Sequence, residues 1–221
     1  MDIHRYCEEH SSADDPALNQ IYRSVMLSSA NPQMASTPYQ GLLLQMLAAI
    51  SKPRIAVEVG SYAGYGAACI AKGLPEGGKL HIIEIDEEHE DSILRNAVAA
   101  GVDDKVVLHI GSALDIIPQL PDGIGLAFVD ADKTNYSHYY DLLIGKMEIG
   151  GLLLFDNMLW HGRVEDELTD SRLRCNQSTR VIQELNSRIT EDPRVQNILL
   201  PVRDGLMLCR AVSRGNNSGN Q

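Results

Sequence analysis

From about residue 54 onward, the chain alternates apolar segments of strand length with segments of helical pattern. The apolar segments lie at 54–60, 79–85, 105–110, 124–130 and 150–156. The helical segments between them lie at 64–73, 87–101, 113–119 and 135–146. This alternation predicts a parallel, doubly wound α/β sheet with helices on both of its faces.

Segments outside this alternation complete the expected fold. The segments 195–201 and 206–212 are joined through Asp204-Gly205, a dipeptide typical of turns between antiparallel strands. Two helices are expected before the sheet, at 16–29 and 39–51. Seven strands that end in an antiparallel pair differ from a plain dinucleotide-binding fold.

No internal repeat or linker divides the chain, so we expect one domain over residues 1–221. Its expected parts are a helical cap at 1–52, a cofactor-binding sheet at 53–213 and a disordered tail at 214–221.

Composition and charge exclude several classes of function. The 221 residues carry a net charge of −11, and no cluster of lysine and arginine exceeds two residues. Such a chain suits neither nucleic-acid backbones nor anionic membrane surfaces. The longest apolar run, 42–50, is interrupted by Gln45 and is too short to span a bilayer. The first residues lack the apolar core of a signal peptide.

The cysteines show neither metal-ligand nor redox spacing, at Cys7, Cys69, Cys175 and Cys209. We therefore expect reduced thiols and a cytoplasmic protein.

Acidic and amide side chains follow two of the apolar segments directly. One segment continues as Phe128-Val-Asp-Ala-Asp-Lys133 and the other as Leu154-Phe-Asp156-Asn157. The carboxyl ends of neighbouring parallel strands meet at the edge where open α/β sheets bind ligands. Oxygen ligands from two such strands make a plausible site for a divalent cation. Lys133 then places a possible proton acceptor beside the cation.

A glycine-rich loop follows the first expected strand, in the sequence Val57-Glu-Val-Gly-Ser-Tyr-Ala-Gly-Tyr-Gly66. Glycines let a backbone approach a ligand closely, and a helix N-terminus favours an anionic group. The spacing is not G-x-G-x-x-G, so a pyrophosphate site fits poorly. The second strand ends near Glu84, whose carboxylate suits the two hydroxyls of a ribose. After the third strand, Ser112 and Ala113 leave room for a flat ring.

Together these motifs make the chain resemble the cation-dependent class I S-adenosylmethionine O-methyltransferases, which include the caffeoyl-CoA and catechol O-methyltransferases. The resemblance extends from about Met34 to Arg210. It rests on Ser36…Gln40-Gly41, Glu58-Val-Gly-Ser-Tyr-Ala-Gly-Tyr, Asp130-Ala-Asp-Lys-x-x-Tyr136, Asp156-Asn157-x-Leu-Trp160-x-Gly162 and Asp204-Gly-Leu-x-Leu-Cys-Arg210. It implies a Rossmann-like, seven-stranded methyltransferase sheet with a C-terminal antiparallel hairpin and N-terminal helices.

The resemblance also implies roles for individual residues. The catalytic residues would be Lys133, as general base, and Asp130. The ligands of a divalent cation, Mg²⁺ before Mn²⁺ or Ca²⁺, would be Asp130, Asp156 and Asn157. The cofactor S-adenosylmethionine would contact Ser36, Glu58, Gly60, Ser61, Tyr65, Gly66, Glu84, Ser112, Ala113, Asp130 and Asp132. The acceptor would contact Trp160, His161 and Asp204. Relatives are commonly homodimers, so a homodimer is implied as well.

The chain departs from the family pattern at three places. Gly66 stands where a serine usually helps to hold the cofactor carboxylate. Arg203 precedes Asp204 where relatives often carry glycine, which could alter the acceptor pocket. The tryptophan that accompanies the lysine in catechol-type members is absent, since Ala131 and Asp132 occupy that stretch. This last departure favours the caffeoyl-CoA and bacterial branch.

The expected reaction is methylation of one hydroxyl of a catechol-like or hydroxycinnamoyl small molecule. A phenol has a pKa of about 10 and is a poor nucleophile at neutral pH, so chelation by a cation would stabilise the phenolate. Two alternatives stay open: an NAD-dependent dehydrogenase on a similar sheet, and a non-catalytic module that binds S-adenosylmethionine.

Overall fold

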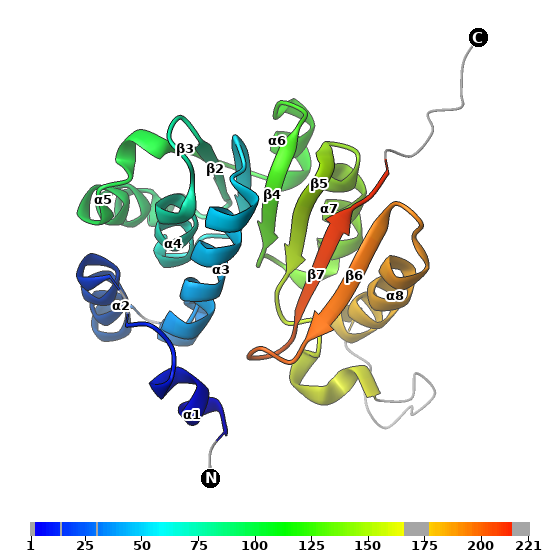
Figure 1. Cartoon of the computed structure of the whole chain (residues 1–221), viewed down its shortest axis with the longest axis horizontal. Helices are drawn as coiled ribbons and strands as arrows, with labels where there is room; N and C mark the ends of the chain where they lie inside the picture. The colour runs from blue at the N-terminus through cyan, green and yellow to red at the C-terminus, as the bar shows by residue number, and fades with distance from the viewer. Residues whose placement is uncertain (1–2, 14, 30, 166–176, 214–221) are drawn as a thin grey trace.

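The computed structural model describes residues 3–13, 15–29, 31–165 and 177–213. The expected tail at 214–221 and Cys175 lie outside the described residues. The centre of the fold is one sheet with the strand order β3-β2-β1-β4-β5-β7-β6 (Figure 1). The strands are β1 (Ile55–Val59), β2 (Lys79–Glu84), β3 (Val106–Ile110), β4 (Ile124–Val129), β5 (Met147–Phe155), β6 (Val195–Leu200) and β7 (Leu206–Ala211).

The strand pairing confirms the predicted seven-stranded sheet. The first five strands pair in parallel, and β7 lies antiparallel between β5 and β6. The strand order reverses between β1 and β4, which is where open α/β sheets form a ligand-binding crevice. All six residues of β4 are buried, as expected of a strand with a helical layer on each face.

Six helices match the predicted ones, with small shifts at their ends. They are α2 (Pro16–Ser28), α3 (Pro38–Ser51), α4 (Tyr65–Gly73), α5 (Glu90–Ala100), α6 (Ala113–Ile116) and α7 (Tyr136–Ile144). Short 3-10 turns lie at Pro32–Met34, Glu87–His89, Asp103–Lys105, Ile117–Gln119 and Lys133–Asn135. The segment Trp160–Glu165 also contains 3-10 turns, which are interrupted by the left-handed residues His161 and Gly162. The predicted helix at 113–119 was too long, because Pro118 cannot donate the next helical hydrogen bond and the last turn tightens.

Two helices were not predicted, α1 (Ile3–Glu9) and α8 (Gln177–Glu191). The buried positions of α8 include Ile182, Leu185 and Ile189, whose spacing is that of a helix with one apolar face. That signal was present in the sequence. A second correction concerns β5, which begins at Met147 rather than at residue 150.

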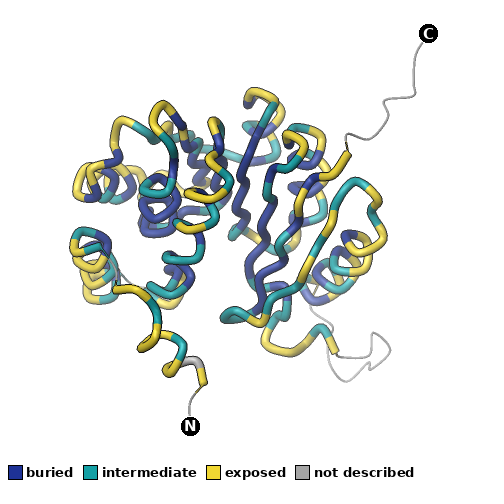
Figure 2. The backbone as a smooth tube through the Cα atoms, viewed as in Figure 1, coloured by how far each residue is buried: buried dark blue, intermediate teal, exposed yellow. Residues whose placement is uncertain are grey.

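The helices form a layer on each face of the sheet (Figure 1). Helices α2, α3, α4 and α5 contribute to the core on one face, and α6, α7 and α8 to the core on the other. Figure 2 shows the buried backbone concentrated along the central strands. No helix among the described residues is long and apolar enough to cross a membrane. The described cysteines, Cys7, Cys69 and Cys209, form no disulfide.

A pair of histidines joins the two outer strands on the parallel side of the sheet. His81 of β2 and His109 of β3 have stacked rings, and Nδ1 of His81 lies 3.0 Å from Nε2 of His109. One ring must donate to the other, so the contact requires at least one neutral imidazole. Burial lowers the pKa of both rings, and the nearby His109 lowers that of His81 further.

This pair should make stability depend on pH. Because the pKa values are lowered in the folded state, the unfolded chain binds more protons near the unfolded pKa of about 6.5. The contribution of this pair to the free energy of unfolding is therefore complete above that pH. It is lost as the pH falls through the lowered pKa values of the folded state. Urea unfolding between about pH 7.5 and 5.5 should show a falling free energy of unfolding. The double variant His81→Asn/His109→Gln should flatten this slope, whereas His138→Gln, at an exposed histidine, should not.

Candidate active site

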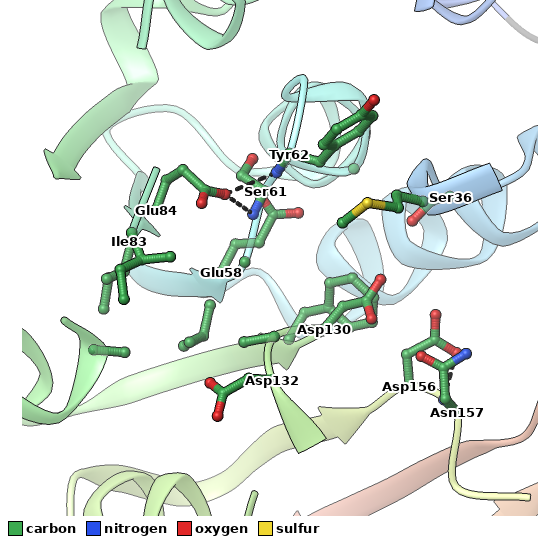
Figure 3. Close-up of a pocket in the computed structure, with 18 of the residues that line it drawn as sticks. Ser36, Glu58, Ser61, Tyr62, Ile83, Glu84, Asp130, Asp132, Asp156 and Asn157 are labelled. Atoms are coloured by element: carbon green, nitrogen blue, oxygen red, sulfur yellow. Dashed lines mark hydrogen bonds between the residues drawn. The ribbon is translucent and has the colours of Figure 1, made fainter. Parts of the chain in front are cut away.

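A cavity of about 880 Å³ opens at the carboxyl ends of β1, β2, β4 and β5 (Figure 3). All of the site residues predicted from the sequence line it, from Glu84 and Ala113 at one end to Trp160, His161 and Asp204 at the other. The sequence motifs, which are far apart in the chain, therefore meet in one place. Its size is that of a typical site for a small molecule or cofactor.

The glycine loop lies against the ends of the neighbouring strands. Gly60 has a φ of +82°, and a side chain there would collide with the backbone carbonyl of Asp130. Its N–H donates to the carbonyl of Ile83 at 2.9 Å. Position 60 therefore requires glycine both for its backbone conformation and for the close approach of β4.

Glu84 holds this loop in place. Its Oε2 accepts hydrogen bonds from the backbone N–H groups of Ser61 and Tyr62, both at 2.9 Å (Figure 3). Its Oε1 accepts from the backbone N–H of Asp86 at 3.1 Å. The carboxylate is buried at the cavity wall. Glu84 thus shapes the loop directly, and its predicted contact with a ribose stays a prediction.

Glu58 is a buried carboxyl group at the floor of the cavity. Burial raises the pKa of Glu58 to about 8, and the charges of Asp130 and Glu84 add to this rise, whereas the nearby Ser61 side chain acts in the opposite direction. Among the described residues, Glu58 Oε2 and Ser61 Oγ are buried polar atoms without a hydrogen-bond partner. Buried polar atoms without partners are costly, so a polar ligand that reaches them would be stabilised.

Gly66 makes room for this carboxyl group. A side-chain carbon at position 66 would lie 2.7 Å from Glu58 Oε1, a distance that forces one of them to move. In this backbone, Gly66 therefore leaves space for the carboxyl group, where the family pattern has serine.

Other predicted residues lie in the same wall but differ in how they are engaged. Asp132 accepts hydrogen bonds from three side chains of its own turn and helix, those of Thr134, Asn135 and Tyr139. Tyr65 is buried and packs against Tyr22, with ring centroids 5.3 Å apart. The remaining predicted cofactor residues that line the cavity are Ser36, Ser112 and Ala113.

Lys133 is fixed by two partners at the end of β4. Its Nζ donates to Asp130 Oδ1 at 2.9 Å and to the hydroxyl of Tyr136 at 2.7 Å. The Tyr136 hydroxyl also lies 3.1 Å from the carbonyl of Asp156 and 3.2 Å from that of Val129. Burial, with the charges of Asp130 and Asp156, raises the pKa of Tyr136, so its hydroxyl stays protonated. Lys133 is therefore held at a defined point of the cavity.

Asp156 is a buried carboxylate at the end of β5. Its Oδ1 accepts from the backbone N–H of Asn157 at 2.8 Å, and its Oδ2 accepts from Gln40 Nε2 at 2.8 Å. Burial and the charge of Asp130 raise the pKa of Asp156, while Gln40 and Arg203 act in the opposite direction. The sequence places Gln40 in a family motif but predicts no role for it, because its partners Asp156 and Arg203 lie far from it in the chain.

The predicted cation ligands come together at this edge. Figure 3 shows the side chains of Asp130, Asp156 and Asn157 close together beyond the ends of β4 and β5. Two carboxylates and an amide are hard oxygen donors, and a cation between them would relieve the repulsion that raises the pKa of Asp156. This donor set fits a divalent cation. Among the described residues, no three His, Cys, Asp or Glu side chains form a metal-binding group.

Asp204 ties together two loops on the side of the cavity that is predicted to bind the acceptor. Its Oδ1 accepts from the backbone N–H of His161 at 2.5 Å, and its Oδ2 lies 3.5 Å from both His161 Nδ1 and Asn157 Nδ2. The Trp160 Nε1 atom is buried without a hydrogen-bond partner among the described residues. Helix α8 supports this region, since Asn186 Nδ2 donates to the carbonyl of Met158 at 3.0 Å.

Backbone strain is concentrated at the cavity. The described residues include six non-glycine residues with positive φ, and one of them, Lys52, ends a helix away from the cavity. The other five line the cavity: Tyr62, Asn157, Trp160, His161 and Arg203. Such conformations persist when the surroundings determine them, and they are common at functional sites.

The role of Glu84 in the loop can be tested by stability measurements. Glu84→Ala removes the acceptor of three backbone N–H groups, so the free energy of unfolding should fall by about 2–4 kcal/mol. Urea unfolding monitored by circular dichroism measures this. Glu87→Ala, a loss of an exposed carboxylate nearby, should change it by less than about 0.5 kcal/mol. An equal, small effect of both variants would contradict the role of Glu84 in holding the loop.

Comparison with known proteins agrees with the geometry of this site. A profile of the O-methyltransferase family matches residues 8–212. The chain is 36% identical to caffeoyl-CoA O-methyltransferase 1 of Eucalyptus globulus over 187 residues, which are 81% of this chain and 76% of that protein. It is 34% identical to tricin synthase 2 of Oryza sativa subsp. japonica over 205 residues, which are 88% of this chain and 70% of that protein.

Solved structures match along nearly the whole chain. An O-methyltransferase from Bacillus cereus in complex with SAH superposes with a TM-score of 0.84 and 25% identity, covering 95% of this chain and 96% of that one. The methyltransferase PaMTH1 of Podospora anserina superposes with a TM-score of 0.85 and 24% identity, covering 96% and 94%. At 24% identity, the similarity to PaMTH1 shows a common fold.

Proposed function

Because the chain belongs to the O-methyltransferase family and is an S-adenosylmethionine-dependent O-methyltransferase, we propose that it methylates one hydroxyl of a catechol-like or hydroxycinnamoyl small molecule at a divalent-cation site. Family membership excludes the dehydrogenase alternative. The observation that carries the proposal is the pairing of two chemically different ends in one cavity. One end has the buried polar atoms Glu58 Oε2 and Ser61 Oγ, for which the described residues provide no well-placed hydrogen-bond partner, and the other has Lys133 beside the oxygen cluster of Asp130 and Asp156.

The first end suits the methionine part of the cofactor. The Glu58 carboxylate would bind its ammonium group, with Ser61, Ser36 and the backbone near Gly66 around the carboxylate end. Glu84 would contact the ribose, and the remaining cofactor contacts would come from Gly60, Tyr65, Ser112, Ala113, Asp130 and Asp132. These assignments follow the family motifs, and they gain support from the position of every one of these residues in the cavity wall.

The second end suits the acceptor. Asp130, Asp156 and Asn157 would hold the cation, with Mg²⁺ the expected ion and Mn²⁺ or Ca²⁺ alternatives. When bound, the cofactor supplies an electrophilic methyl group, and the cation supplies charge that stabilises a phenolate. Lys133 would take the proton of the acceptor hydroxyl from its fixed position. Asp130 and Tyr136 would orient the Lys133 amine, so positioning would account for much of the acceleration.

The walls of the second end would select the acceptor. Trp160, His161 and Asp204 would contact it, and relatives named for caffeoyl-CoA support a hydroxycinnamoyl group. The homodimer, the cytoplasmic location and the single domain stay predictions.

Methyl transfer from labelled S-adenosylmethionine to a panel of catechols and hydroxycinnamoyl thioesters tests the proposed reaction. Transfer should require Mg²⁺ and stop with EDTA, while calorimetry should show that the cofactor still binds. Lys133→Met should lower kcat by about 10² or more, because it removes the base but keeps the length of the side chain.

Asp156→Asn should weaken Mg²⁺ activation and leave cofactor affinity within about threefold of wild type, because Asp156 would bind the cation rather than the cofactor. Transfer that persists in EDTA or in Lys133→Met would contradict the proposed chemistry.

The raised pKa of Glu58 predicts how cofactor binding depends on pH. With a pKa of about 8, the free carboxyl group is largely protonated at pH 7, whereas pairing with an ammonium group requires the carboxylate. Cofactor affinity should therefore rise between about pH 6 and 7.5, below the pH at which the α-ammonium group itself loses its proton, with proton release near neutral pH. Calorimetry in buffers of different ionisation enthalpy measures that release.

Glu58→Gln should bind weakly at every pH, since glutamine resembles the protonated acid. A wild-type affinity that does not change over this range would contradict the role of Glu58.

A further inference from the structure

Arg203 reaches from the turn between β6 and β7 to the predicted cation ligands. Its Nη1 donates to Gln40 Oε1 at 2.6 Å and lies 3.8 Å from Asp156 Oδ2. Gln40 is fully buried, and its Nε2 donates to the same Asp156 oxygen at 2.8 Å. Gln40 therefore links the guanidinium group to the carboxylate, and the three side chains form one connected cluster.

The backbone at Arg203 indicates that this placement is determined by its surroundings. Its φ is +50°, a left-handed conformation that favours glycine. The next two residues are fixed, because the carbonyls of Asp204 and Gly205 accept from the backbone N–H groups of Leu159 and Met158 at 2.8 and 2.9 Å. The turn thus aims position 203 at the end of β5.

This placement of Arg203 changes the net charge around the predicted cation ligands. Lys133 pairs with Asp130, and Arg203 lies beside Asp156, so each predicted carboxylate ligand has a cationic side chain within 4 Å. These four groups sum to a formal charge of zero. A divalent cation is attracted by the net negative charge of its ligands, so Arg203 opposes cation binding.

We propose that Arg203 is an internal counter-ion that competes with the divalent cation for Asp156. This inference rests on the cation site of the proposed function. Binding of a cation displaces the guanidinium group from Asp156 toward the cavity, which is possible because a quarter of the Arg203 side chain is already exposed. The wild-type protein consequently binds divalent cations weakly, and residue 203 sets that affinity.

The proposal can be tested without turnover by titrating the protein with Mn²⁺ alone. The electron paramagnetic resonance signal of the free ion then reports how much Mn²⁺ is bound. Arg203→Gln removes the charge but keeps a group that can bond Gln40, and Mn²⁺ affinity should rise about tenfold. Arg203→Lys keeps the charge and should stay close to wild type. Arg203→Gly, which suits the left-handed backbone, provides a second charge-free variant should Arg203→Gln fail to fold.

Arg188→Gln is the matched control, because Arg188 pairs with Asp141 on the surface and its loss changes net charge equally. It should leave Mn²⁺ affinity unchanged. Adding Asp156→Asn to Arg203→Gln should abolish the gain. Equal affinities of wild type and Arg203→Gln, or an equal gain in Arg188→Gln, would overturn this inference alone. Failure of every variant to bind Mn²⁺ would overturn the proposed cation site together with it.

Discussion

The arrangement of this active site depends on placing two carboxylates, Asp130 and Asp156, beside each other in a largely buried place. They are adjacent because β4 and β5 are neighbouring parallel strands, and the backbone N–H of Asp156 donates to the carbonyl of Val129. Burial and the charge of Asp130 both oppose the ionisation of Asp156. Lys133 pairs with Asp130, and the side chains of Arg203 and Gln40 offset part of that cost at Asp156. A cation between the carboxylates would offset more of it.

The other half of the cavity is organised by the same strand ends. Gly60 lets the loop after β1 approach the carbonyl of Asp130, and Glu84 binds the backbone of that loop from β2. The two ends of the cavity, proposed to bind the cofactor and the acceptor, are therefore built on one edge of the sheet. This arrangement would bring a methyl donor and an acceptor hydroxyl into line.

Local sequence patterns predicted most of the secondary structure and the position of the candidate site. Apolar runs predicted the strands, and the oxygen-bearing residues after them predicted where the cavity lies, because strand polarity alone brings those ends together. Helix α8 was missed although Ile182, Leu185 and Ile189 carry its periodicity. The link from Gln40 to Asp156 and Arg203 could not be predicted, since it joins residues 116 and 163 positions apart and depends on tertiary packing. The space beside Gly66 for Glu58 likewise depends on the folded backbone.

The central claim is that a divalent cation binds at the end of β4 and β5. A crystal structure with Mn²⁺ and the cofactor, with data collected at the manganese absorption edge, tests it most directly. The account predicts an anomalous peak within about 2.6 Å of carboxylate oxygens of both Asp130 and Asp156, with the Arg203 guanidinium moved away from Asp156. A peak bound elsewhere, or none there at saturating Mn²⁺, would contradict it.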